Sequence, residues 1–124
     1  MKIVKVAIAL LLVAAAGIAD ANPSNKWRIK CNSNAKADGE VVLSIEPEGG
    51  TPIEVVVAIP DGTNENSAAV YIRDELKKAL KETHRVERDD WEDVLVKKRY
   101  GQPDFDLILQ DNTAEGLSVK VARE

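Results

Sequence analysis

Cysteine and histidine are almost absent from this chain of 124 residues, which contains one of each, Cys31 and His84. A single cysteine excludes an internal disulfide, and one cysteine with one histidine cannot supply the ligand set of a zinc site. A glycine-rich phosphate loop is also missing, because EGG and DGT are isolated turn signals. We therefore expect no bound metal and no cofactor.

Aromatic residues and basic charge are scarce as well. The chain has five aromatic residues, too few to build a sugar-binding cleft, and 17 basic residues against 21 acidic ones. A nucleic-acid-binding protein needs a basic surplus to neutralise phosphates. This balance argues against nucleic acid as a partner.

The hydrophobic run at the start of the chain is too short to span a bilayer, which takes about 20 apolar residues in a helix. It covers residues 6–16, follows Lys2 and Lys5, and precedes the small residues Ala19 and Ala21. This pattern predicts a signal peptide over residues 1–21, cleaved after Ala21, with a retained membrane anchor as the alternative. We expect an exported protein, periplasmic or extracellular, that meets the membrane only transiently during export.

The remaining residues, 22–124, have the length of a single domain. Without Lys2, Lys5 and Asp20 they keep 15 basic and 20 acidic residues, a net charge of −5. Cys31 alternates with basic residues in the same way as Trp27 and Ile29, as on the inward face of a strand. This alternation favours a buried thiol over one paired with another molecule.

Alternating apolar residues predict further strands along the chain. They occur in EVVLSIE, PIEVVVAIP, HRVER, VLVKKRY, FDLILQ and LSVKVAR. The segment PEGGTP separates the first two and predicts a hairpin, since its glycines and prolines can turn the chain but cannot continue a ladder.

One amphipathic helix is predicted over residues 64–82. Thr63 or Asn64 is placed to cap its first turn, and Asp74 and Lys78 have the supportive i,i+4 spacing. Short sequential strands joined by turns favour an antiparallel sheet. The predicted fold class is α+β, a small antiparallel sheet with the helix packed on one face.

The order of these elements over residues 39–110 resembles a module of phage tail-tube proteins and flagellin insertions. In those proteins a hairpin leads through a capped Ala/Ile/Leu helix into a second hairpin, and Gly62, Thr63, Ala68, Ala69 and Ile72 match that rhythm. Tail subunits lack a secretion signal, so the expected leader is a departure from the family. The resemblance implies an interaction or assembly module and carries over no catalytic residues.

The segment VERDDWEDVLVKKR, residues 86–99, concentrates acidic residues around Trp91. Its valines are typical of two strands, and Asp89 and Asp90 suit the turn of a hairpin. A low-affinity calcium or ligand site formed by this acidic group is an alternative; the residues concerned are Asp89, Asp90, Glu92 and Asp93.

Four residues are predicted to bind a partner. Trp91 is one, because an exposed ring at a hairpin tip is costly unless it folds back or meets another molecule. The others form the basic group Lys97, Lys98 and Arg99, which suits an anionic partner but also fits an ordinary solvated sheet face.

Our first hypothesis is an exported, non-catalytic module that binds a protein, or a second copy, through a sheet edge or face. An inhibitor-like role falls within it. The second hypothesis is a small enzyme in which His84 works with carboxylates such as Asp90. Outside an active site, His84 is expected to follow the helix C-terminus, where a partly positive ring is favoured.

Overall fold

The computed structural model describes residues 22–124, so the predicted signal peptide lies outside the described residues. The described chain forms seven strands and one helix: β1 (Lys26–Asn32), β2 (Gly39–Pro47), β3 (Ile53–Ile59), α2 (Glu65–Ala79), β4 (His84–Asp89), β5 (Asp93–Lys98), β6 (Phe105–Asn112) and β7 (Ser118–Arg123). Every predicted strand is present, and none of the helices in this part of the chain is long and apolar enough to cross a membrane.

The strands form two antiparallel sheets, which confirms the α+β fold class but divides the predicted sheet in two. One sheet has the order β4-β5-β1-β7 and the other has the order β3-β2-β6. The predicted hairpins β2–β3 and β4–β5 both form. β1, by contrast, pairs with two distant strands, β5 and β7. Alternation predicts which face of a strand is buried but not which strands become neighbours.

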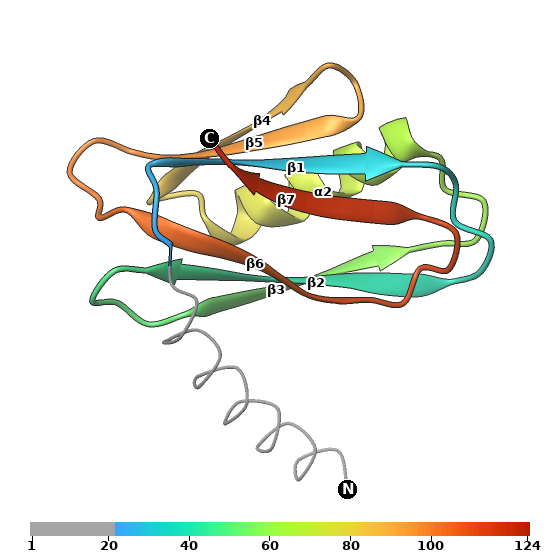
Figure 1. The fold of residues 1–124 in the computed structure, drawn as a ribbon, viewed down its shortest axis with the longest axis horizontal. Coiled ribbons are helices and arrows are strands. Elements are labelled where there is room, and N and C mark those ends of the chain that lie inside the picture. Colours follow the sequence, from blue (N-terminus) through green and yellow to red (C-terminus); the bar gives the residue numbers. More distant parts are fainter. Residues whose placement is uncertain (1–21) are drawn as a thin grey trace, which may run out of the picture.

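The helix lies between the two free sheet edges. β7 and β6 approach each other where the sheets meet, whereas α2 contacts β3 of one sheet and β4, β5 and β1 of the other. In Figure 1, β1 and β7 lie above β2, β3 and β6, and α2 runs behind the strands. The edge strands β3 and β4 therefore each have a strand on one side and the helix near the other.

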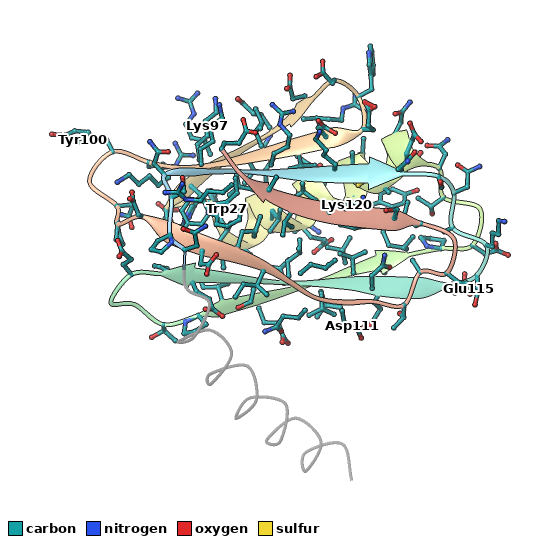
Figure 2. The ribbon with its side chains drawn as sticks, viewed as in Figure 1. Trp27, Lys97, Tyr100, Asp111, Glu115 and Lys120 are labelled. Atoms are coloured by element: carbon teal, nitrogen blue, oxygen red, sulfur yellow. The ribbon has the colours of Figure 1, made fainter. Side chains whose placement is uncertain are left out.

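The core lies between the sheets and the helix. The inward face of β1 consists of Trp27, Ile29 and Cys31, all buried, which confirms the alternation and the predicted burial of the thiol. Trp27 donates a hydrogen bond from Nε1 to the carbonyl of Phe105 at 2.8 Å, which satisfies its one polar group inside the core. Figure 2 shows Trp27 between β1 and β6.

The helix begins as the sequence predicts. Asn64 is the N-cap, since its side chain accepts a hydrogen bond from the amide of Ser67 at 2.8 Å, while the Thr63 hydroxyl donates to the carbonyl of Pro60. The predicted pair of Asp74 with Lys78 does not form, because Lys78 pairs with Glu75 at 3.2 Å. The buried residues Ala68, Ala69, Ile72 and Leu76 form the apolar stripe that faces the core.

Candidate functional site

Strand β3 presents an exposed sheet edge of unusual composition. Val55, Val57 and Ile59 point into the core, which leaves Glu54, Val56 and Ala58 on the outer face. Val56 is 46% exposed. Among the described residues, no backbone hydrogen bond outside the ladder with β2 involves residues 53–59. The backbone amide and carbonyl groups that point away from β2, at every second residue of β3, are thus free to bind another strand.

A groove runs between β3 and the outer side of the helix. It has a volume of about 550 Å³ and is lined by Val57, Ala58 and Pro60 on one side and by Tyr71, Asp74, Glu75, Lys77 and Lys78 on the other. Tyr71 is 39% exposed, so its ring forms part of the groove wall and not of the core. The size falls within the range of ligand pockets in proteins, about 300 to 1,000 Å³.

The sequence did not single out this groove. The available signal was the run of three valines in β3, residues 55–57. With alternate residues facing inward, a continuous apolar run must place one valine on the solvent side. That residue is Val56, whereas Tyr71 gave no signal of its own because a tyrosine on a helix is usually part of an amphipathic face.

A second hollow lies on the other side of the helix, against β4. It has a volume of about 310 Å³ and is lined by Lys77, Lys78, Lys81, His84, Val86 and Arg99. No acidic residue contributes to this lining, in contrast to the groove at β3.

His84 is buried at the base of this second hollow and is 3% exposed. Its Nδ1 lies 2.7 Å from the hydroxyl of Thr83, and its ring meets the ring of Phe105 edge to face at a centroid distance of 4.5 Å. Burial, followed by the charge of Arg99, lowers the pKa of His84. The ring follows the helix C-terminus as expected, with the His84 amide bonded to the carbonyl of Leu80. The expectation of a partly positive ring is not met, because the buried site favours the neutral form.

The acidic segment forms the end of the β4–β5 hairpin and is tied to β1. Nη1 of Arg28 donates to Asp93 at 2.7 Å and to Asp89 at 3.0 Å, and these hydrogen bonds raise the pKa of Arg28. Two of the four carboxylates proposed for calcium are therefore engaged by a guanidinium. Within residues 22–124, no group of three or more His, Cys, Asp or Glu side chains is arranged to hold a metal ion.

Trp91 stands at the turn of this hairpin and is 69% exposed. Asp90 and Trp91 have φ values of 47° and 64°, in the left-handed region that favours glycine. The guanidinium of Arg88 lies 5.2 Å from the Trp91 ring centroid, a cation–π contact on the protein surface. The ring is neither folded back onto the core nor hydrogen-bonded to it.

The structure separates the four predicted partner-binding residues. Lys97 pairs with Glu87 at 2.8 Å and Lys98 pairs with Asp104 at 2.9 Å, as expected for a solvated sheet face. Arg99 lines the hollow over His84 instead. Trp91 lies in the turn before β5 and Lys97 lies near the other end of that strand, four residues or roughly 13 Å beyond its start, so these residues do not form one compact site.

His84 and Asp90 are also far apart. They lie at the start of β4 and just beyond its end, roughly 20 Å apart along an extended strand. The two groups named for acid–base catalysis therefore do not converge. Tyr100, which is fully exposed, projects from the loop after β5 (Figure 2).

Comparison of the chain with models of known protein families gives no match, and neither does comparison with curated protein sequences. The resemblance to phage tail-tube and flagellin modules therefore stays a prediction.

Proposed function

We propose that this protein is an exported, non-catalytic module that binds an extended segment of a partner protein as an added strand on β3. The observation that carries the proposal is the free edge of β3, which exposes Val56, Ala58 and one charged residue, Glu54, on its outer face and borders a groove. In strand addition, the backbone of the edge supplies hydrogen bonds and neighbouring side chains supply selectivity.

The two free edges differ in how they are protected. β4 carries Arg85 and Glu87 at its exposed positions, and charges of this kind discourage pairing with another strand. β3 has one charged residue, Glu54, and neither lysine nor proline in its seven residues. A strand of that length extends over about 23 Å, enough to hold a peptide of six or seven residues.

The helix beside β3 favours a peptide over a second folded copy. A strand added to β3 must fit beside the groove wall formed by Tyr71, Asp74 and Lys78. An isolated extended segment meets this requirement, whereas the edge of another sheet would bring its own neighbouring elements against that wall. Successive side chains of an added strand point to opposite faces, so we expect apolar residues at the alternate positions that face the groove and Tyr71.

The experiment is a selection from a displayed library of random peptides against residues 22–124. We expect enriched peptides with apolar residues at every second position. A selected peptide should bind Tyr71→Ala and Val56→Lys more weakly than the unmodified protein by roughly tenfold, because the first loses groove contacts and the second adds a charge to the edge.

Matched control variants are Tyr100→Ala and Val42→Lys. Tyr100 is exposed far from the groove, and Val42 lies opposite Val56 on β2, one strand away from the edge. Neither control should weaken binding by more than about twofold. Selected peptides that bind all four variants equally, or concentration-dependent self-association abolished by Val56→Lys, would overturn the proposal of a peptide partner at β3.

A further inference from the structure

The charged residues around the hollow between the end of the helix and β4 are all positive. The hollow is surrounded by Lys77, Lys78, Lys81 and Arg99. Of these, Lys78 forms an ion pair with Glu75 on the helix surface. Arg99 is held in place because its Nε donates to the carbonyl of Lys81 at 3.2 Å. Positive charges concentrated around a concave surface attract an anion.

Part of this cluster has a structural explanation. Lys77 and Lys78 lie in the last turn of the helix, where positive charge stabilises the helix dipole. Lys81 and Arg99 lie beyond the last residue of α2, and Arg99 comes from the far side of the β4–β5 hairpin. The dipole alone therefore does not account for all four charges meeting at one hollow.

The base of the hollow is apolar. Val86 is buried and the His84 ring packs edge to face with Phe105, so the deepest surface consists of a methyl-bearing side chain and a neutral ring. The stems of the surrounding lysines extend this apolar surface toward the rim. Such a base does not suit a fully hydrated ion such as inorganic phosphate, which would lose water without gaining hydrogen bonds there.

His84 adds an independent observation. Its Nε2 is the one buried side-chain nitrogen or oxygen among the described residues that lacks a hydrogen-bond partner. Buried polar groups are almost always paired, so an unpaired one calls for an explanation. His84 lines the hollow, so a ligand bound there would lie beside the ring that carries this unpaired nitrogen.

We propose that this hollow binds a small amphiphilic carboxylate, with its apolar part against Val86 and His84 and its carboxylate among Lys77, Lys81 and Arg99. The volume of about 310 Å³ is at the lower end of the range for ligand pockets, which fits a single apolar chain or one ring. The site is separate from the strand-binding edge of β3, and its test does not require a peptide partner.

The experiment uses dodecanoate as the probe, below its micelle concentration, with binding followed by calorimetry and by amide and methyl shifts of residues 22–124. Dodecanoate should bind, and the largest shifts should fall on Val86, His84 and the last turn of α2. Dodecanol, dodecyltrimethylammonium and inorganic phosphate serve as comparison ligands. Each lacks either the carboxylate, the negative charge or the apolar chain, so each should bind at least about tenfold more weakly.

The variant Lys81→Gln with Arg99→Gln removes the two rim charges that line this hollow and not the groove at β3. It should weaken dodecanoate binding by roughly tenfold. Lys30→Gln with Lys120→Gln removes the same charge from paired positions on β1 and β7, and should leave binding unchanged.

Three results would overturn the proposal. They are no binding of dodecanoate, equal binding of dodecanol or phosphate, and equal losses in the two double variants. Thermal unfolding of each variant establishes that it is folded at the temperature of the measurement. Peptide binding at β3 should be retained by Lys81→Gln with Arg99→Gln, so failure of this proposal and failure of the strand-binding proposal can be told apart.

Discussion

Arg28 on β1 donates a hydrogen bond of 2.7 Å to Asp93, the first residue of β5, and the same nitrogen bonds Asp89 at the end of β4. Asp93 is buried, with 7% of its surface exposed. One guanidinium thus stabilises two carboxylates that would otherwise repel each other where the β4–β5 hairpin joins the rest of its sheet. The acidic segment is therefore tied to β1 through two of its carboxylates.

Replacing Arg28 by alanine should lower the free energy of unfolding by about 2 kcal/mol, because Asp93 is left buried without a charged partner. Urea unfolding at neutral pH measures this change. Lys97→Ala is the matched control, since it removes an exposed pair with Glu87 and should cost less than about 1 kcal/mol. Equal losses in the two variants would contradict the structural role assigned to Arg28.

Trp91 should contribute little to folding stability. Glycine in its place loses the contact with Arg88 but relieves the positive φ of 64°, so Trp91→Gly should stay within about 1 kcal/mol of the unmodified protein. Trp91→Val loses the contact and keeps an unfavourable backbone, and should be less stable by about 1 to 2 kcal/mol. A large loss in the glycine variant would mean that the ring is structural. A small loss of stability would agree with the prediction that Trp91 contacts a partner, at a site separate from β3.

The stability of the fold should fall on acidification because of His84. Its pKa is lowered in the folded protein by burial and by Arg99, so the unfolded chain binds the proton more tightly. The stabilisation from the neutral ring is fully present above the ordinary pKa of 6.5 and is lost as the pH falls from there through the lower pKa of the folded state. The other charged groups that line the hollow at His84 are Lys77, Lys78 and Lys81.

Urea unfolding between about pH 7.5 and about pH 5.5 measures this dependence, in a range where most carboxylates stay ionised. His84→Phe should flatten the profile, since the ring against Phe105 no longer titrates. A profile that is unchanged in His84→Phe would show that other groups cause the loss.

The thiol of Cys31 should resist modification in the folded protein. Burial raises the pKa of Cys31 to about 12, and the negative charges of Asp93, Glu65 and Glu92 act in the same direction. At about pH 8 we expect no reaction with iodoacetamide in buffer and complete reaction in urea, because the thiolate is the reactive form. Rapid alkylation of the folded protein, or a disulfide-linked dimer on a non-reducing gel, would contradict burial.

The elements of this fold were predictable from local pattern, whereas their arrangement was not. The cap at Asn64, the inward face of β1 and the turn between β4 and β5 follow from a few neighbouring residues. The division into two sheets depends on the pairing of β1 with β5 and β7, which are distant in the sequence. Local alternation contains no information about such pairings.

The candidate sites show the same limit. Trp91 was recognisable as an exposed ring because it lies in a turn, and Arg99 was recognisable as part of a basic group. That Arg99 reaches the end of α2 over His84, while Lys97 and Lys98 pair with acids, depends on contacts across the fold. Val56 and Tyr71 come from separate elements, and their groove exists only because the helix packs beside a free edge.

The most direct test of strand addition at β3 is a backbone methylation scan of a peptide selected against this protein. Methylation of one amide removes a hydrogen-bond donor without changing any side chain. Because alternate amides of an added strand point toward and away from β3, methylation should weaken binding by tenfold or more at every second position and have little effect at the positions between. Equal effects at all positions, or no effect at any, would contradict the claim that β3 binds its partner as a strand.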